Sequence, residues 1–158
     1  MRLLKQISDQ ENYAMKQNIL IIEENFAMRY LLSSVLSSEC CTSTYSDCYG
    51  AARELKAGRI QVVVLSVEDE GTKNFDFLLH LASSSFYSNI PVIVITNNTS
   101  NEFRLKCLDL GVEAFFLKPF DPLSLLDCIN VNAFLSENML RMTETENFDA
   151  AYKVGMPS

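Results

Sequence analysis

The strongest constraint on the fold is a short, continuous run of β-branched and other apolar residues near the N-terminus. The run Asn18-Ile19-Leu20-Ile21-Ile22 has the length of a strand and is followed by Glu23 and Glu24. A strand without polar alternation is covered on both faces, which is typical of a parallel sheet between layers of helices. The run therefore predicts a central strand of such a sheet.

Strands of this kind alternate with helical patterns along the chain. The expected strands cover 18–22, 40–45, 60–66, 91–96 and 114–117. The expected helices, placed by periodicity and by the caps Asn25, Ser46 and Asp121, cover about 26–38, 47–57, 75–84, 100–110 and 122–133. This alternation predicts an α/β fold, a three-layer (βα)5 doubly wound parallel sheet with strand order 2-1-3-4-5. The core is expected to contain Ile19, Ile21, Leu31, Val35, Val63, Leu65, Leu81, Val92, Val94, Ile95 and Ile129.

Composition excludes several classes of function. A net charge of −7 over 158 residues disfavours nucleic acid and anionic membrane surfaces as partners. No apolar run is long enough to span a bilayer, and the N-terminus lacks a signal-peptide core. The five cysteines form no CxxC pair and His80 is the only histidine, so we expect reduced thiols, no zinc site and a cytoplasmic location.

The predicted topology places the functional site without further information. In a doubly wound sheet, ligands bind outside the carboxyl ends of the strands. The residues expected there are Glu23, Glu24, Ser66, Thr96 and Lys118. Two carboxylates, two hydroxyls and one ammonium group should therefore meet in one crevice.

Three segments resemble the response-regulator receiver domains of bacteria. The opening strand with its acidic pair, 19–25, precedes Arg29, and 90–96 ends in a threonine as the fourth strand of that family does. The segment 111–120, with Lys118-Pro119, is similar to the family's fifth strand and Lys-Pro turn. The resemblance covers roughly 18–131 and implies a flavodoxin-like fold.

The resemblance also implies phosphoryl transfer from a histidine kinase to an aspartate at the end of the third strand. In the family, that aspartate and the acidic pair hold magnesium, while the lysine and threonine contact the phosphoryl group. Ser66 stands where the aspartate is expected, and its hydroxyl has no base at hand and does not form the acyl phosphate. Any magnesium would have only Glu23 and Glu24. We expect a vestigial phosphorylation pocket with no catalytic residue and no cofactor.

A displaced acid is the alternative. A shift of the third strand by two or three residues would make Glu68 or Asp69 the acceptor, and magnesium would then be needed. The apolar run 62–65 instead ends the strand at Ser66, which would place Glu68 outside the crevice. Phe115 corresponds to the family's rotating aromatic, and we expect it here to be a fixed packing residue.

The expected function is that of a pseudo-receiver, a non-enzymatic interaction module of a bacterial two-component-like system. The fourth and fifth helices carry more apolar residues than one buried stripe needs, which favours an interface. A homodimer or another protein partner is expected on the face made by the fourth helix, fifth strand and fifth helix, through Phe103, Leu105, Val131 and Phe134. Alternatively, Leu3, Leu4 and Ile7 cover that face.

The chain is expected to divide into three parts. These are an N-terminal lead over 1–17, the receiver-like domain over 18–135, and a tail or linker over 136–158. A further domain after the tail is compatible with this division. The chain would then be the N-terminal regulatory domain of a larger enzyme, such as a sugar transferase.

Overall fold

The computed structural model describes residues 16–135, in which five strands alternate with five helices. The strands are β1 (Gln17–Ile22), β2 (Cys40–Tyr45), β3 (Val62–Ser66), β4 (Val92–Thr96) and β5 (Ala114–Leu117). The helices are α2 (Phe26–Leu36), α3 (Cys48–Lys56), α4 (Lys73–Ser83), α5 (Asn101–Asp109) and one over 122–135. The fourth and fifth helices of the sequence-based prediction are thus α5 and the 122–135 helix.

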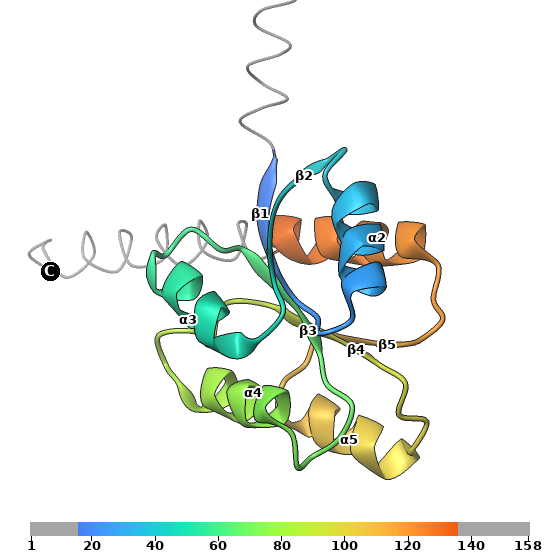
Figure 1. The fold of residues 1–158 in the computed structure, drawn as a ribbon. Coiled ribbons are helices and arrows are strands. Elements are labelled where there is room, and N and C mark those ends of the chain that lie inside the picture. The colour runs from blue at the N-terminus through green and yellow to red at the C-terminus, as the bar shows by residue number, and fades with distance from the viewer. Residues whose placement is uncertain (1–15, 136–158) are drawn as a thin grey trace, which may run out of the picture.

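All neighbouring strands pair in parallel, in the order β2-β1-β3-β4-β5. Helices α3, α4 and α5 cover one face of the sheet, while α2 and the 122–135 helix cover the other (Figure 1). The predicted flavodoxin-like fold and its strand order are confirmed. The strands β3 and β4 are buried along their whole length because both faces carry helices, whereas β2 and β5 form the partly exposed edges.

Most helix starts follow the predicted caps. The Asn25 side chain accepts a hydrogen bond from the backbone N–H of Met28, as predicted. Ser100 caps α5 in the same way, although the sequence pattern predicts that it lies inside the helix. The prediction of Ser46 as a cap is wrong. Asp47 caps α3 instead, because its carboxylate accepts from the first backbone N–H groups of the helix, at 3.0 and 3.3 Å.

The predicted core is correct except in α2. The nine strand and helix residues outside α2 are buried, whereas Leu31 is 43% exposed and Val35 is partly exposed. Helix α2 turns Leu32 and Leu36 toward the sheet, and these residues lie four apart on one face. Leu31 lies about 100° around the helix from Leu32, which carries it to the surface.

The predicted division into lead, domain and tail stays a prediction. Residues 1–15 and 136–158 lie outside the described residues, and so do Leu3, Leu4 and Ile7. Between residues 16 and 135, no helix combines the length and apolar character that crossing a membrane requires.

Candidate functional site

A crevice opens at the carboxyl ends of the central strands, where the sequence placed it. It is lined by the ends of β1 and β3, by the first residues of α4 and by the loops that follow β3, β4 and β5. All five predicted residues are near this end of the sheet. Glu23, Ser66 and Lys118 meet directly, Glu24 lies exposed on the rim, and Thr96 is fully buried beside them.

Lys118 is the centre of the site. Its backbone N–H donates to the carbonyl oxygen of Thr96 at 2.8 Å, which continues the β4–β5 pairing and fixes where the side chain begins. Its Nζ donates to Glu23 Oε2 at 3.0 Å, to Ser66 Oγ at 3.1 Å and to Glu68 Oε1 at 2.9 Å. Burial lowers the pKa of this ammonium group, but the bonds to Glu68 and Glu23 outweigh burial, so the pKa lies above its ordinary value.

Glu23 is the buried carboxylate of the site, with only 3% of its side chain exposed. Its Oε1 accepts from the backbone N–H of Asn25 at 3.0 Å, while Oε2 faces Lys118. Arg29 reaches back from α2 and donates to the carbonyl oxygens of Glu23 and Glu24 at 2.8 and 3.3 Å. The loop after β1 is therefore held so that Glu23 points inward.

Two hydroxyls lie at the inner end of the crevice, that of Ser66 in its lining and that of Thr96 buried behind it. Ser66 is the last residue of β3, and the Asn74 amide of α4 donates to its backbone carbonyl at 2.7 Å. Thr96 ends β4, and its hydroxyl accepts from the backbone N–H of Asn98 at 3.0 Å. Both hydroxyls are therefore placed by strand ends and by the loops that follow them.

The expectation that Glu68 lies outside the crevice is wrong. Its Oε1 accepts from Lys118, and its Oε2 accepts from the backbone N–H of Asn97 at 2.8 Å and from the Thr96 hydroxyl at 3.4 Å. The chain stays extended past β3, because the N–H of Val67 donates to the carbonyl of Ile95. In an extended chain, residues two apart face the same side, so Glu68 follows Ser66 into the crevice.

The bonds to Glu68 also set its ionisation. Partial burial alone would raise the pKa of this carboxyl group, but hydrogen bonds from Asn97, Lys118 and Thr96 outweigh burial and lower it. The carboxylate is therefore charged at neutral pH. By contrast, Asp69 is exposed, accepts from the backbone N–H of Glu70 at 2.7 Å and is not among the residues that line the crevice.

Sequence reasoning missed the asparagines of the site. Asn97 and Asn98 follow β4 and bind Glu68 through the Asn97 backbone and the Asn98 side chain, which donates to the Glu68 carbonyl at 3.0 Å. Asn74 binds the end of β3 from α4. The alternation of side chains past Ser66 would have found Glu68, whereas contacts of the asparagines depend on loop conformation.

The donor set does not fit a magnesium ion. Mg²⁺ is usually bound in octahedral geometry through one or two carboxylates, and water molecules supply its remaining ligands. Here Lys118 Nζ already donates a hydrogen bond to Oε2 of Glu23, and Ser66 offers a hydroxyl in place of a carboxylate. Within residues 16–135, no three His, Cys, Asp or Glu residues are grouped so that they could hold a metal ion.

The aromatic residues below the site form part of the core. Phe115 is half-buried on β5 and packs edge-on against Phe103 of α5, with ring centroids 6.1 Å apart. Phe103 also contacts Phe75 of α4, at 6.3 Å, and is only 3% exposed. Phe103 therefore does not belong to an exposed interface, and its expected place there is wrong because it fills the space between the helices and the sheet.

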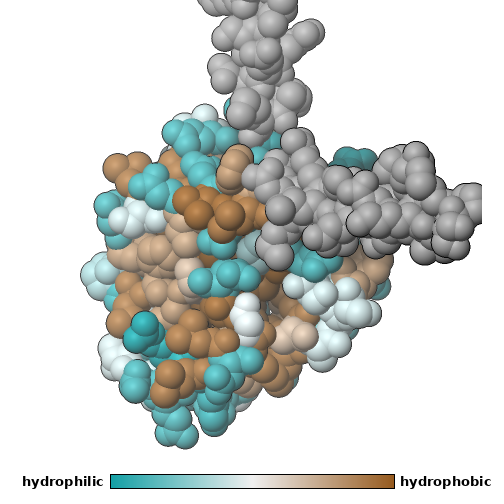
Figure 2. Space-filling view, turned by 180° about the vertical axis from the view of Figure 1, so that it is seen from behind, coloured by the Kyte–Doolittle hydropathy of each residue, from teal (hydrophilic) through white to brown (hydrophobic). Residues whose placement is uncertain are grey.

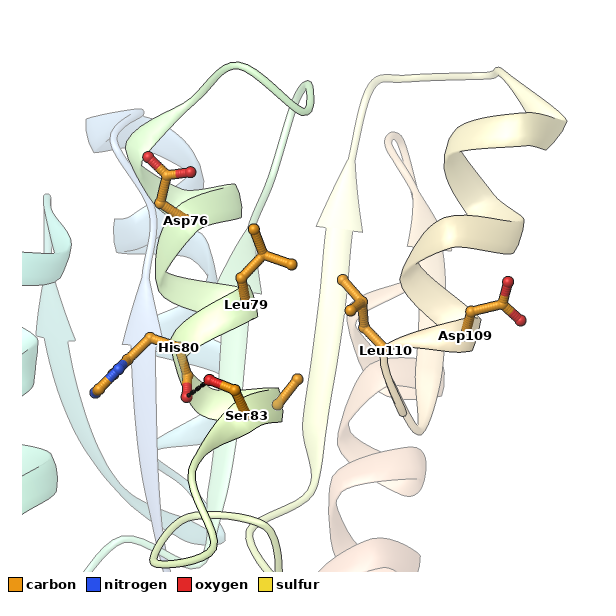
Figure 3. A pocket seen from close by; sticks show the side chains of 7 residues that line it. Asp76, Leu79, His80, Ser83, Asp109 and Leu110 are labelled. Atoms are coloured by element: carbon orange, nitrogen blue, oxygen red, sulfur yellow. Dashed lines mark hydrogen bonds between the residues drawn. The ribbon is translucent and has the colours of Figure 1, made fainter.

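A second hollow, between α4 and α5, offers no reactive pair. Leu79 and Leu110 face each other across it, while the His80 ring and the Asp109 carboxylate point away (Figure 3). The backbone carbonyl of His80 accepts from the Ser83 hydroxyl, and the His80 ring packs against Tyr87. The single histidine is therefore far from the crevice and cannot serve as its base.

Comparison with known proteins places these features in a family. The chain is 26% identical over 113 residues to the phosphate regulon transcriptional regulatory protein PhoB of Escherichia coli, which covers 71% of the chain and 49% of PhoB. The chain thus spans about half the length of this curated relative.

Solved structures share the fold. The chemotaxis protein CheY4 of Vibrio cholerae superposes with a TM-score of 0.63 at 23% identity, over 71% of this chain and 94% of CheY4. The receiver domain of the sensor histidine kinase PA1611 from Pseudomonas aeruginosa has a magnesium ion in its active site cleft. It superposes with a TM-score of 0.65 at 19% identity, over 75% of this chain and 98% of the PA1611 domain. The model of the response regulator receiver domain matches residues 19–130. This chain therefore belongs to the response regulator receiver domain family of two-component signal transduction.

Proposed function

We propose that this receiver domain is a pseudo-receiver that regulates through protein contacts and is not phosphorylated at the usual position. The observation that carries the proposal is the hydroxyl of Ser66 at the carboxyl end of β3, bound to Lys118 Nζ at 3.1 Å. An acyl phosphate needs a carboxylate nucleophile, and a serine without a neighbouring base is a weak nucleophile. The only histidine, His80, lies on α4 outside the crevice.

The charges of the crevice support the same proposal. Lys118, which in the family contacts the phosphoryl group, is already bound to Glu23 and Glu68. The PA1611 receiver domain binds magnesium in its cleft. In this chain the inner oxygen of Glu23 faces Lys118, so we propose that magnesium-dependent phosphoryl transfer has been lost.

A second candidate function rests on the position of Glu68. Its carboxylate lies 2.9 Å from Lys118 and inside the crevice, so a working receiver could use it as a displaced acceptor. The exposed Asp69 is a weaker choice because its carboxylate accepts from the Glu70 backbone and does not line the crevice. Glu68, however, is held by its hydrogen bonds, which reduces its reactivity as a nucleophile.

Incubation with Mg²⁺ and acetyl phosphate separates the two candidates. We expect no hydroxylamine-sensitive acyl phosphate on the intact protein by mass spectrometry. Stoichiometric labelling that is lost in Glu68→Gln would establish Glu68 as the acceptor and overturn the pseudo-receiver. Asp69→Asn is the matched control on the same loop, and loss of label in that variant alone would point to Asp69.

The contact surface is proposed on exposed apolar residues of the face made by α5, β5 and the 122–135 helix. Leu105 of α5 is 52% exposed, and Val131 and Phe134 of the 122–135 helix are 56% and 63% exposed. Viewed from behind, hydrophobic patches interrupt the hydrophilic surface (Figure 2). We propose a homodimer or a protein partner on this face, in keeping with receiver domains as modules that bind other proteins.

Light scattering with and without EDTA tests this association. We expect a dimer at tens of micromolar, unaffected by EDTA and weakened by Phe134→Glu, because a charge would be buried in the contact. A monomer that the substitution leaves unchanged would remove this face as a self-association surface. Leu79→Glu on α4, a residue that is 40% exposed, is the control outside the proposed face.

The domain is also proposed to regulate a larger system. PhoB is a transcriptional regulator about half of which this chain matches. Two arrangements agree with this: a bacterial signalling protein with its own partner, or the N-terminal regulatory domain of a longer enzyme. Sequencing the complete coding region distinguishes them.

A further inference from the structure

Hydrogen-bond donors surround the Glu68 carboxylate on both of its oxygens. Its Oε1 faces Lys118 Nζ at 2.9 Å and the Ser66 hydroxyl at 3.5 Å, while its Oε2 faces the Asn97 backbone N–H at 2.8 Å and the Thr96 hydroxyl at 3.4 Å. These groups come from the ends of three strands or the loops just after them. A carboxylate with one ion-pair partner is the ordinary case at a surface, as at Glu70, whose carboxylate binds Lys106 at 2.8 Å.

The backbone holds Glu68 in place for this contact. The N–H of Val67 donates to the Ile95 carbonyl at 3.1 Å, and the Asn98 side chain donates to the carbonyl of Glu68 at 3.0 Å. The carboxylate is thus tethered beside its donors. A tethered group competes with free ligands at a high effective concentration.

The charges around the crevice oppose any incoming anion while Glu68 is present. Three carboxylates, Glu23, Glu24 and Glu68, line it together with two ammonium groups, Lys73 and Lys118. Removal of the Glu68 carboxylate would change the sum of these charges from −1 to zero. It would also leave three donors without this acceptor: the Asn97 backbone N–H, one N–H of the Lys118 ammonium group and the Thr96 hydroxyl.

We propose that Glu68 is an internal ligand of an oxyanion site, which the chain fills with its own carboxylate in place of a phosphoryl group or free phosphate. This inference rests on the proposed function, because a Glu68 that accepted phosphate would be a nucleophile rather than a ligand. The Glu68 carboxylate holds the Asn97 loop, Thr96 and Lys118 in one fixed arrangement. This arrangement of the crevice therefore does not depend on a kinase.

The test is a titration with inorganic phosphate, followed at the Asn97 backbone amide by ¹H–¹⁵N NMR. We expect no saturable shift in the wild type and a saturable shift in Glu68→Ala, with phosphate affinity higher by at least about tenfold. Acetate, which returns the missing carboxylate, should also shift this amide in Glu68→Ala. Glu70→Ala, on the same loop but bound to the exposed Lys106, should behave as the wild type.

Glu68→Gln is a second variant for the same titration, and it removes the charge of residue 68 without leaving an empty space. Its amide fills the same space, so we expect a shifted Asn97 amide signal and still no saturable phosphate binding. The proposal of an internal ligand would be overturned if the wild type bound phosphate as tightly as Glu68→Ala. It would also be overturned if the Asn97 amide signal were identical in the wild type, Glu68→Ala and Glu68→Gln. Acyl-phosphate labelling of the wild type at Glu68 would instead overturn the proposed function, so the two failures are distinguishable.

Discussion

The two carboxylates that share Lys118 lie in contrasting surroundings. Glu23 is 3% exposed at the side chain and is held by a backbone N–H and by Lys118, whereas the Glu68 side chain is 42% exposed and is held by the loop after β4. A buried charge must be paired, because desolvation without compensation is expensive. We therefore expect the half of the crevice around Glu23 to contribute mainly to stability, and we propose a regulatory role for the half around Glu68.

If the proposed function holds, this contrast separates stability from regulation within one small site. Lys118 belongs to both halves, so its substitution affects both. Substitution of Glu23 should act mainly on the free energy of unfolding, and substitution of Glu68 mainly on the state of the Asn97 loop.

The largest effect is expected from Lys118→Met. This change leaves Glu23 buried without its charged partner, and breaking a buried pair costs about 3–5 kcal/mol of unfolding free energy. Urea unfolding followed by circular dichroism measures the loss. The double variant Glu23→Gln/Lys118→Met should recover much of it, because neither side chain is then charged.

A matched control shows whether the cost comes from burial. Lys106 forms an ion pair with Glu70 in which both side chains are nearly half exposed, at 48% and 41%. Lys106→Met should change the urea midpoint far less than Lys118→Met, because water screens an exposed pair. Equal losses in the two variants would remove the distinction between the two halves of the crevice.

The next effect is the difference between Glu23→Gln and Glu68→Gln. Glu23→Gln should lower the free energy of unfolding by about 1–3 kcal/mol, because a buried, hydrogen-bonded carboxylate is replaced by a neutral amide with fewer accepting sites. The second should cost less, because Glu68 is more exposed. Urea midpoints of the two single variants measure the difference, and a larger loss in Glu68→Gln would reverse the assignment of roles.

The smallest effect is the pH dependence carried by Glu68. Its pKa is lower in the folded protein than the ordinary 4.5, so its stabilising contribution is present above 4.5 and is lost as the pH falls through the folded value. Urea midpoints from about pH 6 to about pH 3 should therefore decline less steeply in Glu68→Gln than in the wild type. Parallel curves would show that the hydrogen bonds of Glu68 do not lower its pKa.

Much of the fold was predictable because buried parallel strands leave a strong pattern. The continuous apolar runs placed β1, β3 and β4, and the cap Asn25 placed the start of α2. The predictions were wrong where a shift of one residue decides which residue caps a helix or which residue of a helix faces the sheet. Leu31 is exposed because α2 turns its adjacent residue, Leu32, toward the sheet.

The candidate site was predictable only in part. Glu23, Ser66 and Lys118 follow strands directly, so the topology alone brings them together. The apolar run 62–65 predicts Glu68 outside the crevice, because the run does not show that the chain stays extended beyond Ser66. Phe103 was assigned to an interface because a sequence cannot tell which apolar residue of a helix faces the sheet and which faces solvent.

The most direct test of the central claim is the response of the amides to beryllofluoride with Mg²⁺, a mimic of a phosphoryl group on a carboxylate. If Ser66 has replaced the acceptor and Glu68 fills the site, the ¹H–¹⁵N signals of Thr96, Asn97 and Phe115 should stay unchanged at saturating beryllofluoride. Saturable shifts of all three signals in the wild-type protein would show that the crevice still binds a phosphoryl group, and would contradict the account.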